Sequence, residues 1–261
     1  GSSMEGHRKR LKERYLREGL DHFEPHEVLE FLLCYTIPRK DVNETAHALL
    51  EHFGSLSNVL EASPQDLEQV KGVAQHSAIL LSAIPSLTRT YFLSRWAPKE
   101  RLDTALKMGR YAVDLCAGLT EECCYCVCLD TQNRVTARIL LHRGSISSVE
   151  IHPRKVAEVA FRTHAASIVL VHNHPGGSLR LSGDDLRATE AMGRALIAVS
   201  VGFQDHIVVA GDRFVSIAKR WKDGYLNEES ELDQWNFVDY PGSAAAERDD
   251  KGLSETEGAD T

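Results

Sequence analysis

Residues 171–185 read Val-His-Asn-His-Pro-Gly-Gly-Ser-Leu-Arg-Leu-Ser-Gly-Asp-Asp, and this stretch decides the fold because it joins a strand pattern to a helix pattern. Before it, residues 165–171 (AASIVLV) form a short apolar run rich in β-branched side chains, which is typical of a buried strand. After it, residues 186–199 place apolar side chains at helical spacing. The polar stretch is therefore predicted to be a strand-to-helix loop that collects chemically active side chains.

Two histidines and one aspartate of this loop have the spacing of metal ligands. His172 and His174 lie two residues apart at the predicted strand end, where both imidazoles can point at one ion, and Pro175 prevents the strand from continuing. Asp185 can supply a third ligand from the first turn of the following helix. Two histidine nitrogens and one carboxylate leave the fourth tetrahedral position of zinc open for water, which is the composition of a catalytic site.

A proton acceptor outside the ligand set is needed if the metal activates water. Glu122 is the candidate, because it opens a predicted strand over residues 123–130 that can lie beside residues 165–171. Glu121 is the alternative, since successive strand residues point to opposite faces of a sheet and only one of the two can aim at the metal. We favour Glu122, which shares a strand face with Cys124.

The same residues also have a plainer interpretation. Ser182-x-x-Asp185 is a common helix start, with Ser182 as the N-cap and Asp185 favoured by the helix dipole. A single His-x-His is often incidental. The complete pattern of His-x-His-Pro followed by Ser-x-x-Asp is much rarer, with a chance occurrence on the order of 1 in 1,000 in a chain of this length.

This pattern resembles the JAMM motif of MPN-domain metallohydrolases, and His172-Asn173-His174-Pro175 is the form found in the bacterial RadC family. The resemblance covers roughly residues 8–220. It implies an α/β MPN (JAMM)-like domain with a mixed sheet flanked by helices, preceded by an all-α, helix-hairpin-helix-like domain. Further similar segments are Glu30-Phe31-Leu32-Leu33, Ile37-Pro38-Arg39-Lys40-Asp41, Phe53-Gly54-Ser55-Leu56, Leu129-Asp130 and Asp205-His206-Ile207-Val208-Val209.

The resemblance also implies a role for each residue of the loop. His172, His174 and Asp185 would bind one Zn²⁺ per chain, Ser182 would support the developing oxyanion, and Glu122 would be the general acid and base. This chain departs from the family between the His-Pro and the serine. The usual Ser-Gly-Asp-Pro-like loop is replaced by Gly-Gly-Ser-Leu-Arg-Leu over residues 176–181, which keeps every implied ligand but changes the residues that would contact a substrate.

The chain is expected to contain two domains. The helical domain is expected over residues 4–98 and the metallohydrolase-like domain over residues 99–222. Residues 1–3, ahead of the first methionine, are typical of a cloning remnant. Residues 223–261 are mostly polar and acidic, which is typical of a disordered tail.

The helical domain contains a possible nucleic-acid contact. Lys71-Gly72-Val73-Ala74 lies between two predicted helices and resembles the hairpin of a helix-hairpin-helix, which contacts the DNA backbone through amide N–H groups. Ala74 stands where the usual second glycine lies. Lys71, Gly72 and Ala74 are therefore the candidate contacts to branched or single-stranded DNA, and a purely structural helical domain is the alternative.

Composition limits the class of protein. The chain has 261 residues, 43% of them apolar, and a net charge of −8, which argues against a basic surface that binds nucleic acid non-specifically. No apolar run long enough for a membrane span and no signal-peptide pattern occurs, so a soluble, cytoplasmic protein is expected. Four of the six cysteines lie within residues 123–128, where they are expected to be small buried hydrophobic residues.

We expect a zinc-dependent, metallopeptidase-like hydrolase that cleaves an amide or isopeptide bond in a protein or peptide substrate, with a link to DNA repair or replication. One open alternative is a DNA-binding repair accessory with a structural or vestigial metal. Another is a metal-dependent nuclease, although a single carboxylate ligand matches the usual two-metal arrangement poorly. A deaminase is excluded, because its His-x-Glu and Pro-Cys-x-x-Cys signatures are missing. His206, beside Asp205, either orients a ligand or is a core histidine.

Overall fold

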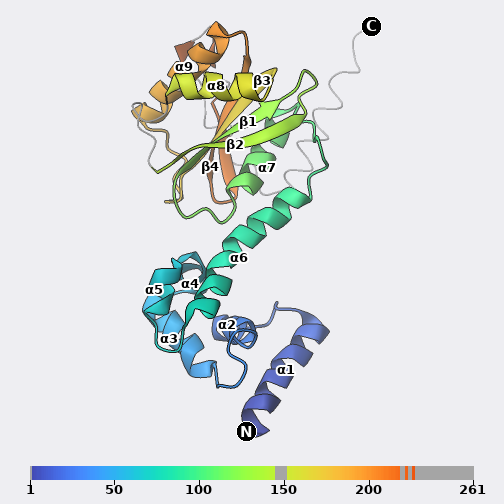
Figure 1. The fold of residues 1–261 in the computed structure, drawn as a ribbon, viewed down its shortest axis with the longest axis vertical. Coiled ribbons are helices and arrows are strands. Elements are labelled where there is room, and N and C mark those ends of the chain that lie inside the picture. The colour runs from blue at the N-terminus through green and yellow to red at the C-terminus, as the bar shows by residue number, and fades with distance from the viewer. Residues whose placement is uncertain (1, 145–151, 218–220, 223–224, 227–261) are drawn as a thin grey trace. The chain divides into compact units, whose positions relative to one another are not determined.

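The computed structural model describes residues 2–144, 152–217, 221–222 and 225–226. Contacts divide the chain into two compact units, Gly1–Thr88 and Arg89–Thr261 (Figure 1). This division comes earlier than the boundary expected at residue 98. The reason is that helix α6 (Gln75–Ser94) runs across the division, and Leu93 near its end packs against the core of the second unit.

The first unit is helical, as expected. Two of its short helices begin at serine N-caps: the Ser55 side chain accepts a hydrogen bond from the Asn58 amide, and that of Ser63 accepts one from the Asp66 amide. Apolar side chains from the helices form one buried core. The helices before α6 are α1 (Ser2–Glu18), α2 (Pro25–Leu33), α3 (Asn43–Phe53), α4 (Leu56–Glu61) and α5 (Pro64–Glu68).

Gly72, in the turn between α5 and α6, is required by the backbone of this unit. Its φ of +94° lies in the left-handed region, and a Cβ atom there would come within 2.6 Å of Thr45 Oγ1 on α3. Lys71 and Ala74 are exposed beside it. Close packing against α3 therefore explains the glycine without reference to a ligand.

The second unit is built on a five-stranded mixed sheet in the order β2-β1-β3-β4-β5. Strands β3 and β4 are parallel and the other neighbouring pairs are antiparallel. This arrangement confirms the expected mixed sheet. The strands are β1 (Cys123–Leu129), β2 (Val135–Arg143), β3 (Ser167–Asn173), β4 (Gly202–Ala210) and β5 (Arg213–Ser216).

Helices cover both faces of this sheet (Figure 1). Helix α7 (Ala105–Cys116) packs on one face, and α8 (Pro153–Arg162) and α9 (Gly183–Ala198) pack on the other. Gly109 allows α7 to approach the sheet closely, because a Cβ at this position would lie 2.0 Å from the Phe214 ring. The central strand β3 is buried along its whole length, which agrees with its nearly continuous apolar sequence.

All six cysteines are buried thiols, as their sequence context predicts. Burial raises the pKa of Cys124 to about 12, so this thiol stays neutral at ordinary pH. Cys124, Cys126 and Cys128 belong to the core between the sheet and helices α8 and α9.

The chain continues in regular structure slightly further than expected. Strands β6 (Trp221–Lys222) and β7 (Tyr225–Leu226) form a small antiparallel hairpin, so the tail expected from residue 223 overlaps a strand. The rest of that expected tail, residues 223–224 and 227–261, lies outside the described residues. Within the described part of the chain, no helix has the length and apolar composition needed to cross a bilayer.

Candidate metal centre

Strand β3 and the residue that follows it place two histidines at one end of the strands. His172 is the penultimate residue of β3, where it is 1% exposed and pairs with Cys124 of β1 and Val208 of β4. The His174 amide still bonds to the Val209 carbonyl at 2.7 Å, after which the chain leaves the sheet. The two imidazole ring centroids are 4.7 Å apart, and the ring planes are inclined at 86°.

Helix α9 delivers Asp185 to the same place. Ser182 is the N-cap: its Oγ accepts a hydrogen bond of 3.1 Å from the Asp185 amide, and its own amide donates one of 2.7 Å to Asp185 Oδ2. This reciprocal capping fixes the first turn of α9 and the carboxylate together. The helix-start interpretation and the metal-site interpretation of Ser182-x-x-Asp185 therefore describe the same geometry.

The Asp185 carboxylate faces both histidines. Its Oδ1 is 3.5 Å from His172 Nδ1, and its Oδ2 is 3.6 Å from His174 Nε2. The structure thus brings together all three side chains that the sequence suggests as ligands, although they come from one strand, one loop and one helix.

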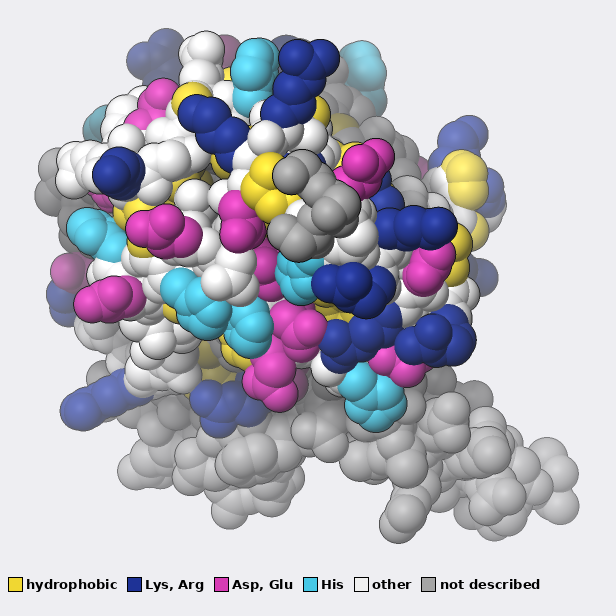
Figure 2. Space-filling model, turned by 90° about the horizontal axis from the view of Figure 1, so that it is seen from below, with side chains coloured by type: hydrophobic (Ala, Val, Ile, Leu, Met, Phe, Trp, Pro, Cys, Tyr) yellow, Lys and Arg dark blue, Asp and Glu magenta, His cyan; other side chains and the backbone are white. Residues whose placement is uncertain are grey.

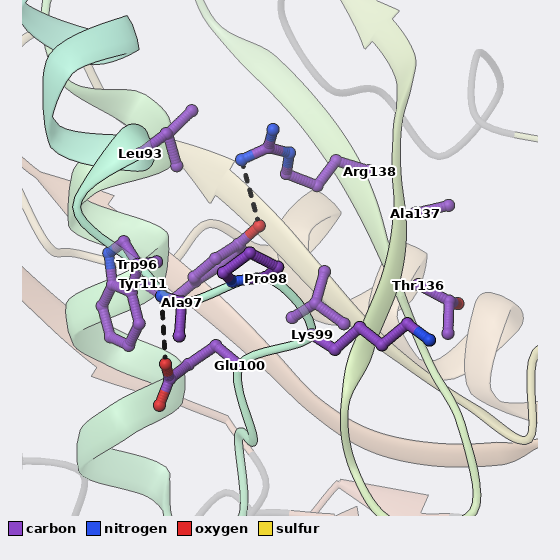
Figure 3. A pocket seen from close by; sticks show the side chains of 11 residues that line it. Leu93, Trp96, Ala97, Pro98, Lys99, Glu100, Tyr111, Thr136, Ala137 and Arg138 are labelled. Atoms are coloured by element: carbon purple, nitrogen blue, oxygen red, sulfur yellow. Dashed lines mark hydrogen bonds between the residues drawn. The ribbon is translucent and has the colours of Figure 1, made fainter.

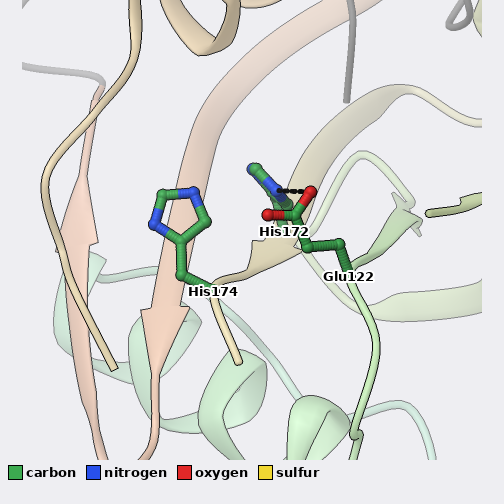
Figure 4. A group of neighbouring side chains, drawn as sticks. All are labelled: Glu122, His172 and His174. Carbon is green, nitrogen blue, oxygen red and sulfur yellow. Dashed lines mark ion pairs between the residues drawn. The ribbon is translucent and has the colours of Figure 1, made fainter. Parts of the chain in front are cut away.

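Glu122 approaches the histidines from the other side. Its Oε2 is 4.0 Å from His172 Nε2, and one atom from each of Glu122, His172 and His174 lies within 4.8 Å of the other two (Figure 4). Glu121 differs, because its carboxylate pairs with Arg143 at 2.9 Å and both side chains are more than half exposed. Of the two neighbouring glutamates, Glu122 is therefore the one at the cluster.

Asn173 holds the segment that carries Glu122, a role that the sequence reasoning missed. Its side-chain Oδ1 accepts a hydrogen bond of 2.7 Å from the Cys123 amide, and its Nδ2 donates one of 3.0 Å to the Glu121 carbonyl. These bonds fix the backbone on both sides of Glu122. The only signal in the sequence was an asparagine between the two candidate ligand histidines, at the end of a strand predicted to be buried, where a polar side chain must find hydrogen-bond partners.

The protonation states of the cluster follow from burial and from the Asp185 charge. Burial lowers the pKa of His172 to about 3, so its imidazole is neutral. Asp185 raises the pKa of His174 above its ordinary value. Burial alone would raise the pKa of Asp185, but His174 and the Ser182 amide outweigh it, so this pKa lies well below its ordinary value. One neutral imidazole and one ionised carboxylate are already in the form that metal ligands require.

The hydrogen bonds of the histidines also suit a metal ion. His174 Nδ1 lies 2.8 Å from the Ser178 carbonyl, which can only accept, so Nδ1 carries the proton and donates. Its Nε2 is thereby directed at the cluster. Both ring nitrogens of His172 are buried and make no hydrogen bond among the described residues. Two buried polar atoms without partners are costly unless another group binds them, and a metal ion fits one of them.

The cluster opens into a cleft of about 390 Å³. Glu122 and Ser182 line it together with His174 and Asp185, and Arg180 of the altered loop adds a cation to its wall. Arg213 donates a hydrogen bond of 3.1 Å to the Gly177 carbonyl and ties this loop to β5. A substrate can therefore reach the candidate metal ligands from solvent.

A second cavity, of about 530 Å³, lies elsewhere in the same unit (Figure 3). Leu93 and Trp96 line one side, and Arg138 of β2 donates a hydrogen bond of 3.2 Å to the Tyr111 hydroxyl. It shares no described lining residue with the cleft beside Glu122 and His174, and its only acidic lining residue is Glu100. The larger cavity therefore lacks the ligand set found in the smaller one.

The DNA contacts suggested by sequence belong to the first unit, whereas the candidate metal ligands belong to the second. Lys71, Gly72 and Ala74 are exposed on the turn between α5 and α6. On the face shown in Figure 2, Lys and Arg side chains are interleaved with Asp, Glu and His side chains. DNA binding by this turn stays a prediction.

Comparison with known proteins assigns both parts of the chain. Residues 102–222 match the family described as RadC-like JAB domain, and residues 6–79 match the family described as UPF0758 N-terminal. A UPF0758 protein of Bordetella petrii is 32% identical over 211 residues, which cover 81% of this chain and 94% of that protein. One from Bacillus pumilus is 30% identical over 224 residues, which cover 84% of this chain and 97% of that protein. The chain therefore belongs to the UPF0758 family of RadC-like proteins and carries a domain of the JAB/MPN type.

Proposed function

We propose that this protein is a zinc-dependent hydrolase that cleaves an amide or isopeptide bond in a protein or peptide. The observation that carries the proposal is the pair of buried His172 ring nitrogens without hydrogen-bond partners among the described residues, which face the carboxylates of Asp185 and Glu122 beside an open cleft. The JAB/MPN-type domain supports it, because that fold is hydrolase-like.

His172, His174 and Asp185 are the proposed ligands. The Asp185 carboxylate is almost completely buried and is fixed by the Ser182 amide, as a ligand of defined position requires. Two imidazole nitrogens and one carboxylate are a typical ligand set of catalytic zinc. When bound, zinc would supply a Lewis acid that polarises a carbonyl group and activates water near neutral pH.

Glu122 is the proposed general base and acid. Its side chain is 30% exposed at the cleft, whereas that of Asp185 is 4% exposed, so Glu122 is the more accessible of the two carboxylates. It would accept a proton from the attacking water and pass it to the leaving nitrogen. Ser182 lines the same cleft, and its hydroxyl proton can be donated to the oxyanion that develops on the substrate.

The test compares Glu122→Gln with Glu121→Gln in zinc-loaded, full-length protein against a panel of peptides and isopeptides. We expect Glu122→Gln to retain zinc and to lower turnover by about 10²–10⁴-fold, because an amide cannot accept the proton. Glu121→Gln is the matched control and should keep full turnover. Loss of turnover in Glu121→Gln alone would identify Glu121 as the general base in place of Glu122. Full turnover in both variants would contradict the mechanism.

The link to DNA repair or replication stays a second, separate proposal. Its support is the exposed turn that carries Lys71 and Gly72. Because the packing against Thr45 already accounts for the glycine, this proposal depends on a binding measurement.

A further inference from the structure

We infer that Thr189 and His206 are positioning residues that hold Asp185 in place for the metal, an inference that rests on the metal site proposed above. Thr189 lies one helical turn after Asp185 on α9 and is completely buried, and His206 of β4 is 1% exposed. Thr189 Oγ1 is 2.7 Å from the Asp185 carbonyl oxygen and 2.5 Å from His206 Nδ1. One hydroxyl thus connects the first turn of α9 to the sheet.

The direction of both hydrogen bonds is fixed by chemistry. A carbonyl oxygen can only accept, so the single hydroxyl proton of Thr189 is donated to the Asp185 carbonyl. The Thr189 oxygen must then accept from His206, which places the imidazole proton on Nδ1. His206 is therefore a donor to α9, and its Nε2 is a buried atom with no hydrogen bond among the described residues.

This chain of bonds connects the helix that delivers Asp185 to the strand beside the one that delivers His172. Strand β4, which carries His206, is the parallel neighbour of β3, which carries His172. Asp185 is consequently held from both sides: Ser182 binds its carboxylate and its amide, and Thr189 binds its backbone carbonyl. Because a metal ion needs its ligands at a defined separation, a loss of the second contact should loosen the site.

The neighbouring Asp205 does not bind the His206 ring but contacts the other face of the sheet. Successive strand residues point to opposite faces, so Asp205 faces the α7 side of the sheet, where its Oδ2 accepts a hydrogen bond of 2.5 Å from Ser216 Oγ. Its Oδ1 accepts one from the His206 amide, not from the imidazole ring. Asp205 and His206 therefore do not act as a carboxylate–imidazole pair, and Thr189 is the partner of the His206 ring.

A purely structural role would change stability but not metal coordination, so the experiment measures coordination. Cobalt(II) is titrated into metal-free, full-length protein, and its visible absorption reports the affinity and the geometry of the ligands. Thr189→Val removes the hydroxyl at nearly constant shape and should weaken cobalt binding by about 10–100-fold. Thr189→Ser keeps the hydroxyl and should restore tight binding.

Two further comparisons separate this role from general damage. Thr163→Val is the matched control, because Thr163 Oγ1 donates to the Val159 carbonyl at the same 2.7 Å on α8, and it should bind cobalt like the wild type. His206→Asn keeps an N–H near the Nδ1 position and should bind better than His206→Gln, whose amide reaches the Nε2 position instead.

The outcomes distinguish this inference from the proposed function. Cobalt binding by wild-type protein, with weakened binding in Thr189→Val and His206→Gln and recovery in Thr189→Ser, supports the positioning role. Unchanged affinity and spectrum in Thr189→Val overturn that role while the metal site stands. Equal weakening in Thr163→Val also overturns it, because the loss would then be general. Wild-type protein that binds no cobalt overturns the proposed metal site itself, and the positioning role with it.

Discussion

Asn173 Oδ1 accepts a hydrogen bond of 2.7 Å from the backbone amide of Cys123, although 50 residues separate the two in sequence. The other end of the same side chain donates to the Glu121 carbonyl at 3.0 Å. The residue between the two candidate ligand histidines therefore fixes the backbone around Glu122. Its position ties the candidate metal ligands to the proposed base.

Asn173→Ala should lower the free energy of unfolding by about 1–3 kcal/mol, because it leaves the Cys123 amide and the Glu121 carbonyl without their buried partner. Denaturant unfolding of the purified variant measures this loss. Asn58→Ala is the control, since Asn58 Nδ2 donates to the Phe53 carbonyl at 2.8 Å in an exposed position. A loss as small as that of the control would show that the Asn173 contacts contribute little.

The stability of the metal-free protein should fall in mild acid because of two buried histidines, His172 and His206, of which His206 can be tested by substitution. Burial lowers the pKa of His206 from the ordinary 6.5 to about 4. Between these values the unfolded chain binds the proton and the folded protein does not, so the stability present above pH 6.5 is lost as the pH falls towards 4. A pKa shift of this size corresponds to a change of about 3 kcal/mol in the free energy of unfolding.

Chemical unfolding at several pH values, with a chelator present, measures that slope. His206→Asn cannot titrate, so its unfolding free energy should change less between pH 6.5 and 4 than that of the wild type. A variant whose slope equals the wild-type slope would show that His206 does not contribute to the acid sensitivity.

DNA binding by the first unit gives a separate prediction. Full-length protein should bind labelled single-stranded or branched DNA weakly at low salt, with an affinity that falls steeply as salt is added. Lys71→Glu should weaken binding and lower the salt slope by about 1. Lys9→Glu, on an exposed lysine of α1 in the same unit, is the control. No binding at low salt, or equal weakening in both variants, would remove the proposed contact.

The architecture was largely predictable because its signals are local. The apolar run before His172 forms strand β3, and Ser182 begins α9 as its spacing to Asp185 indicates. The mixed sheet was expected from the resemblance to RadC. Helix α4 had no comparable signal, since it spans only six residues. Short helices are stabilised mainly by tertiary packing, and sequence periodicity does not report that packing.

The residues of the candidate site were predictable from the sequence, but the hydrogen bonds that position them were not. The motif named His172, His174 and Asp185, and the strand face shared with Cys124 favoured Glu122 over Glu121. The bond from Asn173 to the Glu122 segment and the contact of Thr189 with His206 join residues far apart in sequence. The pairing of β3 with β1 brings the first two partners together, and the packing of α9 against β4 brings the second two together, so no local pattern could reveal them.

The most direct test of the account is the zinc content per chain of purified protein, compared between the wild type and His174→Ala. The account predicts about one zinc per wild-type chain and almost none in the variant, because two remaining protein ligands hold the ion poorly. His76→Ala, on an exposed histidine of α6, should keep its zinc. Wild-type protein that binds no zinc, or His174→Ala protein that retains a full equivalent, would contradict the proposed metal centre.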